Sequence, residues 1–142
     1  MNNKKNLILG QSGGPTAVIN SSLYGVVKES LAHADRIEHV YGMVNGIEGF
    51  LKDMISDFSE VLSEEELEYL KTTPGAYLGS CRCKLPEDLS DPVYPELFCK
   101  FENLNIGYIL YIGGNDSMDT VSKLSRYAAM SGSDILILGE PK

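Results

Sequence analysis

The sequence predicts an α/β fold, in which a parallel β-sheet carries helices on both of its faces. The clearest unit is a strand, a helix and a strand in residues 106–141. Its two strands, IGYILYIGG (106–114) and DILILGE (134–140), are apolar runs typical of buried strands in parallel sheets. No hairpin signal separates them, so a right-handed crossover is expected. The crossover helix, 116–131, has apolar residues at helical spacing: Met118, Val121, Leu124 and Ala128.

The first part of the chain repeats this alternation. An apolar run at 6–10 predicts a buried strand, and the spacing of apolar residues predicts a helix over 17–32. Residues 36–43 predict a second strand. A Ser-x-x-Glu capping box predicts a short helix over 63–70, and one-sided apolar residues predict another over 94–104.

Size and charge exclude several classes of protein. With 142 residues the chain is long enough for one domain. A net charge of −8 without a basic stripe argues against a nucleic-acid partner. No apolar run approaches the ~18 residues of a membrane span. The apolar run near the N-terminus is only about four residues long and predicts a strand, not a signal peptide, so a cytoplasmic location is expected.

Four segments are expected to meet at the carboxyl ends of the predicted strands, where open α/β sheets bind ligands. They are GQSGGPT (10–16), GSCRCK (79–84), GGNDS (113–117) and GEPK (139–142). In the first, Gly13 and Gly14 allow the backbone to bend closely around a ligand, ahead of a helix N-terminus that offers N–H groups to an anion. The segment is neither a Walker A loop nor a dinucleotide-binding fingerprint, and an ordinary glycine-rich turn fits it equally well.

The GGNDS segment combines glycines with polar side chains. Asp116 and Ser117 have two interpretations: they cap the helix that follows, or they take part in binding. A carboxylate beside a phosphate is unfavourable unless it holds a metal or replaces a negative group of the ligand. Arg82 and Lys84 supply cations that suit phosphate, although an ordinary surface position is the alternative for the arginine. Together the segments predict a binding edge for a phosphate chain.

The motifs SGGPTAVINSSLYGVVK, GAYLGSCRCK, YILYIGGNDSMDTVSKL and LILGEPK occur in the order and spacing of the phosphofructokinases. The chain most closely resembles the diphosphate-dependent branch of that family. The resemblance implies a Rossmann-like domain with three layers, a parallel sheet between two layers of helices. It also implies phosphoryl transfer from diphosphate to the 1-hydroxyl of fructose 6-phosphate, with Mg²⁺.

The resemblance assigns roles to individual residues. Gly13 and Gly14 match donor-binding glycines, and Arg82 and Cys83 match the pair that touches the donor phosphates or nucleotide. Lys142 matches a catalytic lysine that stabilises the transition state when diphosphate is the donor. In the family the catalytic segment Thr-Ile-Asp-Asn-Asp follows this lysine. We therefore expect residues 1–142 to be the N-terminal donor-binding domain of a longer enzyme and nearly inactive alone.

Gly114, Asn115, Asp116 and Ser117 match the loop that binds donor and metal. Asp116 stands where ATP-dependent members have glycine, and an aspartate there occupies the space of the ATP α-phosphate and excludes the nucleotide. Asn115 replaces a metal-binding aspartate, and an amide oxygen is a weaker Mg²⁺ ligand. Three alternatives stay open for the metal: it is held through water, by Asp116, or largely by the diphosphate.

Two other functions are alternatives to the diphosphate-dependent enzyme. The first is an ATP-dependent 6-phosphofructokinase, against which Asp116 argues. The second is a non-catalytic module that binds phosphate or diphosphate. The resemblance also implies a homo-oligomer, a dimer or a tetramer, in the full-length enzyme.

Overall fold

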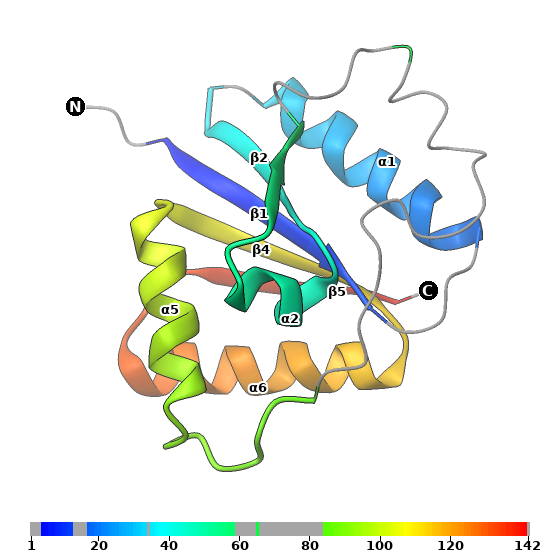
Figure 1. Ribbon diagram of the computed structural model, residues 1–142. Helices are drawn as coiled ribbons and strands as arrows, with labels where there is room; N and C mark the ends of the chain where they lie inside the picture. Colours follow the sequence, from blue (N-terminus) through cyan, green and yellow to red (C-terminus); the bar gives the residue numbers. More distant parts are fainter. Residues whose placement is uncertain (1–3, 13–16, 34, 59–64, 66–83, 142) are drawn as a thin grey trace.

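A computed structural model describes residues 4–12, 17–33, 35–58, 65 and 84–141. Within them a five-stranded sheet has the order β3-β2-β1-β4-β5 and carries helices on both faces (Figure 1). The elements, in chain order, are β1 (Lys5–Gln11), α1 (Ala17–Ala32), β2 (Ile37–Met43), α2 (Gly46–Leu51), β3 (Ile55–Asp57), α5 (Val93–Asn103), β4 (Ile106–Gly113), α6 (Asn115–Ser131) and β5 (Leu136–Pro141).

The four long strands are parallel, as predicted. β1 lies at the centre and pairs with both β2 and β4, while β5 pairs with the far side of β4. After β1 the chain passes through α1 to β2, and after β4 it passes through α6 to β5 in the opposite direction. The strand order therefore reverses between β1 and β4, which is the position where open α/β sheets bind ligands. The carboxyl ends of β1, β4 and β5 lie together at the right of Figure 1.

The structure corrects the expectation of a purely parallel sheet at one edge. β3 pairs with β2 in the antiparallel direction, with Met43 opposite Ile55. Only α2 and short turns separate the two strands, and a parallel crossover needs a dozen or more residues. Asn45 and Gly46 both have positive φ angles, 61° and 63°, and they turn the chain back within this short span.

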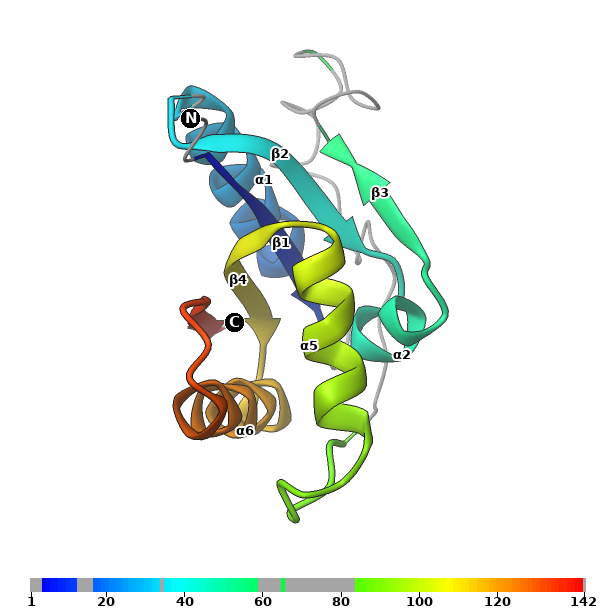
Figure 2. The ribbon, with the colours of Figure 1, turned by 90° about the vertical axis from the view of Figure 1, so that its left-hand side faces the viewer.

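Side chains alternate between two cores on opposite faces of the sheet. From β1, Ile8 packs with α2, α5 and α6, whereas Leu7 and Leu9 pack with α1. Figure 2 shows α1 on one side of the strands and α5 and α6 on the other. On the α5 side the rings of Phe50 and Phe101 stack with centroids 5.0 Å apart, which fixes α2 against α5.

Most predicted elements are confirmed within one or two residues. The helices predicted over 17–32, 94–104 and 116–131 are α1, α5 and α6. The helix predicted over 63–70 lies outside the described residues, apart from Glu65, which is helical. No helix in the described part of the chain is both long enough and apolar enough to cross a membrane.

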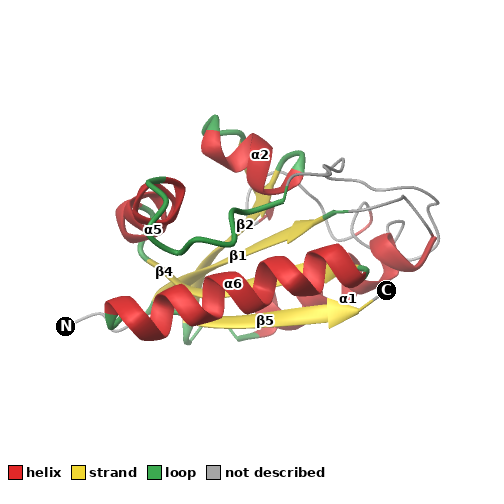
Figure 3. Ribbon diagram, turned by 90° about the horizontal axis from the view of Figure 1, so that it is seen from below, coloured by secondary structure: helices red, strands yellow, loops and turns green. Residues whose placement is uncertain are grey.

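The prediction that β5 is a fully buried strand is wrong for one of its faces. Ile137 packs against the core beside α6, which runs alongside β5 in Figure 3. On the opposite face Leu136 and Leu138 are 60% and 62% exposed. β5 is an edge strand, and α1, which covers this face of the sheet, packs over β1 and β4.

We predict that Leu138→Lys lowers self-association of the chain at high concentration and changes the free energy of unfolding by no more than about 0.5 kcal/mol. The leucine is exposed on an edge strand, so a charge there breaks an apolar patch without entering the core. Light scattering and urea unfolding measure the two effects. The matched control is Ile137→Lys, one residue away on the packed face, which should destabilise the chain by about 2 kcal/mol or more. Equal effects of both variants would contradict the assignment of the two faces.

Candidate functional site

The loops that follow β1 and β4 are tied together at the point where the strand order reverses. Gln11 pairs with Ile112 in the sheet, and the next backbone N–H, of Ser12, donates to the carbonyl oxygen of Ile112 at 3.0 Å. The hydroxyl of Ser12 shares a hydrogen bond with that of Ser117 in the first turn of α6. Both serines are buried. This contact fixes the start of α6 against the end of β1.

Gly113 makes this close approach possible. A Cβ atom on Gly113 would lie 1.9 Å from Oγ of Ser117 and 2.8 Å from the carbonyl oxygen of Ser12. No real side chain tolerates such distances, so a glycine is required by packing, not by an unusual φ angle. That Gly114 leaves room for a phosphate chain remains a prediction.

The first turn of α6 shows that neither Asp116 nor Ser117 is the helix cap. The N-cap is Gly114, which has extended backbone angles and whose carbonyl oxygen accepts from N–H of Met118 at 3.0 Å. Ser117 points inward to Ser12, and Asp116 points outward with its side chain 76% exposed. The capping interpretation is therefore wrong, because both side chains have other partners. A carboxylate in the first turn also interacts favourably with the helix dipole.

Lys84 brings a third predicted segment to the same edge. Its Nζ lies 3.7 Å from Oδ1 of Asp116, and both side chains are largely exposed. An ion pair in such a position contributes no more than about 1 kcal/mol to stability. The ion pair matters for where it lies, because it holds the cation of Lys84 and the carboxylate of Asp116 together at the N-terminus of α6. The fourth segment also reaches this edge, because Pro141 pairs with Gly113 at the end of β5.

The segment 84–90 is anchored from two helices. Leu85 is buried in the core beside α5 and α6, and its carbonyl oxygen accepts from Nζ of Lys123 at 2.8 Å. The next carbonyl oxygen, of Pro86, accepts a hydrogen bond from the hydroxyl of Tyr94 in α5. Burial raises the pKa of Tyr94 above its ordinary value, so the phenol stays protonated as a donor.

Five of the predicted site residues lie outside the described residues. One described residue near the site, Lys123, was not predicted from the sequence. The five are Gly13, Gly14, Arg82, Cys83 and Lys142. Lys123 is only 2% exposed. A signal was present, because Lys123 lies on the same helical face as Thr120 and Leu124 and is four residues after Asp119.

The residues at this edge fit Mg²⁺ that is carried mainly by a phosphate ligand. Among the described residues no group of three or more His, Cys, Asp or Glu side chains could hold a metal. Asn115 and Asp116 offer one amide oxygen and one carboxylate. Proteins often bind Mg²⁺ through one or two carboxylates together with substrate phosphates and water, which needs no cage of protein ligands.

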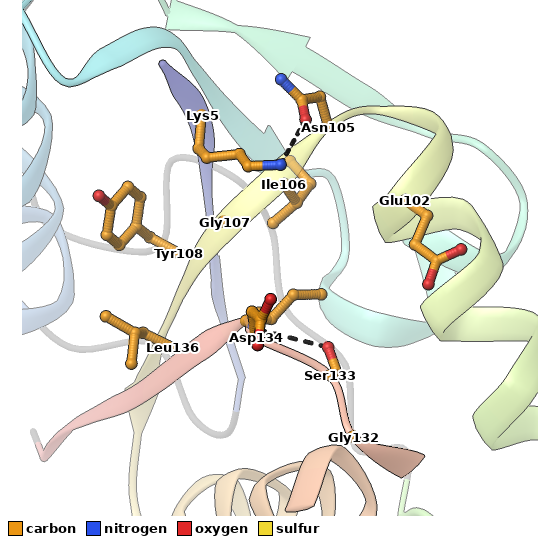
Figure 4. Close-up of a pocket in the computed structure, with 11 residues that line it drawn as sticks. Lys5, Glu102, Asn105, Ile106, Gly107, Tyr108, Gly132, Ser133, Asp134 and Leu136 are labelled. Atoms are coloured by element: carbon orange, nitrogen blue, oxygen red, sulfur yellow. Dashed lines mark hydrogen bonds between the residues drawn. The ribbon is translucent and has the colours of Figure 1, made fainter. Parts of the chain in front are cut away.

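A hollow of about 530 Å³ lies at the opposite edge of the sheet (Figure 4). It is lined by the amino ends of β1, β4 and β5 and by the turn after α6. Lys5 points to Asn105 there, with a distance of 3.0 Å between Nζ and Oδ1. The predicted loops follow the carboxyl ends of the strands, so this hollow is a different place from the candidate site.

Comparison with known proteins decides the family. Residues 6–141 match the family described as phosphofructokinase. The chain belongs to the phosphofructokinase family. Among its relatives, the pyrophosphate–fructose 6-phosphate 1-phosphotransferase of Halomonas elongata is 39% identical over 138 residues. That alignment covers 96% of this chain and 33% of the relative.

Solved phosphofructokinase structures share the fold. The crystal structure of the pyrophosphate-dependent phosphofructokinase from Marinobacter aquaeolei is 41% identical, with a TM-score of 0.85 over 95% of this chain and 32% of that chain. The enzyme of the same description from Nitrosospira multiformis is 35% identical, with a TM-score of 0.88 over 96% of this chain and 33% of that chain. The chain thus spans about a third of the length of these phosphofructokinases.

We predict that Gly113→Ala destabilises this phosphofructokinase chain by about 1–3 kcal/mol, because the added methyl group collides with Ser117 and Ser12. Thermal or urea unfolding measures the loss. The control is Gly25→Ala in α1, where a Cβ meets no described atom within 4 Å and alanine is the better helix former. It should raise stability by about 0.5–1 kcal/mol. Two equal effects would contradict the tight contact at Gly113.

The hydrogen bond from Tyr94 gives a prediction about alkaline pH. Because the folded chain raises the pKa of Tyr94, its contribution to stability is complete below the ordinary value near 10 and is lost as the pH rises through the higher folded value. A phenolate absorbance titration of the wild type minus that of Tyr94→Phe should show one tyrosine that ionises above pH ~10. A difference curve centred at or below that pH would show that Tyr94 is not held as a buried donor.

Proposed function

We propose that this chain is the donor-binding part of a diphosphate-dependent 6-phosphofructokinase. The observation that carries the proposal is the exposed carboxylate of Asp116 in the first turn of α6, beside Lys84. Asp116 stands at a position where a nucleotide-using member of the family has glycine, so a negative group occupies the space that an ATP α-phosphate would need. The relatives named as pyrophosphate-dependent enzymes support the same donor.

The geometry supports binding of a short, highly charged donor. Residues 114–117 form the N-cap and first turn of α6, where N–H groups without partners in the helix can donate to an anion. Lys84 adds a cation within reach of this turn. Its ion pair with Asp116 keeps the local charge near neutral, which lowers the repulsion that a lone carboxylate would impose on diphosphate. A local cation can therefore attract an anionic donor although the chain has a net charge of −8.

The same carboxylate explains selection against ATP. A triphosphate nucleotide bound with its terminal phosphates at the α6 N-terminus would place its α-phosphate against Asp116. Like charges at such close range disfavour binding, and because the carboxylate is largely exposed to solvent we expect a penalty of about 1.4 kcal/mol or more, which is a factor of about ten in affinity. Diphosphate ends before that point and meets no such repulsion, so one carboxylate is enough to discriminate between the two donors.

The roles of the residues outside the described segments belong to this proposal. Gly13, Gly14, Arg82 and Cys83 would complete the donor pocket. Lys142 would stabilise charge on the phosphoryl group in the transition state, where a positioned cation is most effective. Asn115 and Asp116 would offer oxygen ligands to Mg²⁺ carried by the diphosphate, and the ion would further neutralise the phosphate charges.

The activity of a whole enzyme is a proposal as well. It would transfer a phosphoryl group from diphosphate to fructose 6-phosphate in glycolysis and yield fructose 1,6-bisphosphate. Binding of the sugar would depend on residues beyond those that this chain aligns with in its relatives, since it spans only a third of them. We further propose a cytoplasmic location and a homo-oligomeric state for that enzyme.

The test is isothermal titration of this chain with Mg²⁺-diphosphate and, separately, with Mg²⁺-ATP. We expect the wild type to bind diphosphate and not ATP. Asp116→Gly should raise the affinity for Mg²⁺-ATP by about tenfold or more, because it removes the opposing charge. The matched control, Asp134→Gly at the other edge of the sheet, should leave both affinities unchanged. ATP binding to the wild type as tight as diphosphate binding would refute the exclusion by Asp116.

A further inference from the structure

Lys123 is a buried cation that the proposed phosphoryl transfer does not itself use. Its side chain is only 3% exposed, yet it lies in the middle of α6, a helix whose first turn forms the candidate site. Its Nζ donates to the carbonyl oxygen of Leu85 at 2.8 Å and lies 2.8 Å from Oδ2 of Asp119 and 3.1 Å from Oε1 of Glu87. The three N–H groups of the ammonium thus each have an acceptor.

A lysine in this position is not explained by stability alone. Taking an ammonium group out of water is costly, and an apolar side chain of similar size is often as stable or more stable at such a site. The partners Asp119 and Glu87 are themselves 49% and 84% exposed, so they do not require a buried cation. The contact that no apolar side chain could replace is the one with the backbone of Leu85.

The hydrogen bond from Lys123 holds the backbone of Leu85, the residue next to Lys84. Asp116 and Lys123 lie about two turns apart on α6, so their side chains share one face of the helix. Asp116 pairs with the side chain of Lys84, and Lys123 holds the carbonyl oxygen of the next residue. Lys84 and Leu85 are therefore both held against α6. The ammonium group of Lys84 lies toward the N-terminus of that helix.

We propose that Lys123 is a positioning residue that holds Lys84 at the donor-binding edge and thereby sets the affinity for diphosphate. This inference rests on the proposed function, since Lys84 matters only if diphosphate binds there. Without Lys123, the ion pair with Asp116 is the one contact of the Lys84 side chain left among the described residues, and Tyr94 still restrains Pro86 from α5. Residues 84–90 then remain attached to α5, but the ammonium group of Lys84 is no longer held in a fixed position.

A double-mutant cycle separates this role from a general effect on folding. Mg²⁺-diphosphate affinity is measured by isothermal titration for the wild type, Lys123→Met, Lys84→Met and the double variant. We expect each single substitution to weaken binding about tenfold, the effect of losing one hydrogen bond or close contact to a charged group. We expect the double variant to bind no more weakly than Lys84→Met, because Lys123 acts through Lys84.

Two controls accompany the cycle. Lys100→Met removes another partly buried lysine, whose Nζ lies 2.6 Å from Asp53 on the α2–β3 turn, and it should leave diphosphate affinity unchanged. Lys123→Arg keeps a charged donor and should restore most of the affinity and the hydrogen-exchange protection of residues 84–90. If Lys123→Met does not fold, Asp119→Asn takes its place in the cycle, since it weakens the hold on Lys123 from the solvent side.

Each result has one meaning. Unchanged affinity in Lys123→Met, or effects of Lys123 and Lys84 that simply add, would overturn the positioning role while leaving the proposed function intact. A wild-type chain that binds no Mg²⁺-diphosphate would overturn the proposed function for this chain and the inference with it. Non-additive losses with rescue by arginine would establish that Lys123 works through Lys84.

Discussion

The candidate site depends on the close approach between the ends of two central strands. Gly113 lets α6 begin so near to β1 that the hydroxyls of Ser12 and Ser117 meet in a buried hydrogen bond. That contact helps to place two other residues of the site, because α6 carries Asp116 in its first turn and Lys123 farther along. A buried pair of hydroxyls is also specific, since either one left alone would lack a partner. The start of the helix is thus fixed by one pair of side chains and by the absence of a Cβ at Gly113.

Charge at this edge is organised locally. A carboxylate and a cation lie in contact above the helix N-terminus, and a second cation is buried beneath the segment that supplies the first. Burial and the hydrogen bond to Lys123 act in opposite directions on Asp119, and the hydrogen bond prevails, so the pKa of that carboxyl is lowered. The ionised acid therefore persists at neutral pH and keeps Lys123 in place. In this way a protein with a negative net charge can place a single ammonium group where an anionic ligand would bind.

The sequence was sufficient to predict the features that depend on local periodicity. The apolar runs of β1 and β4 and the helical spacing of α1 and α6 predicted the parallel part of the sheet and its crossover helices correctly. It was insufficient where the order and direction of the strands, or contacts between distant segments, decide the outcome. The direction of β3 follows from a short turn, and the exposed face of β5 follows from its place at the sheet edge. The roles of Ser12 and Lys123 depend on partners about 105 and 38 residues away, which no local pattern reveals.

The strand order has a consequence for how the chain acquires its site. β1 pairs with β2 after one helix, and β4 pairs with β5 after one helix, so each half is built from local contacts. The β1–β4 pairing joins segments separated by most of the chain, and its loop-closure entropy is the largest of the three parallel pairings. The Ser12–Ser117 contact belongs to that junction. The candidate edge is therefore completed only by the pairing that joins the two halves, and that pairing carries the largest entropic cost.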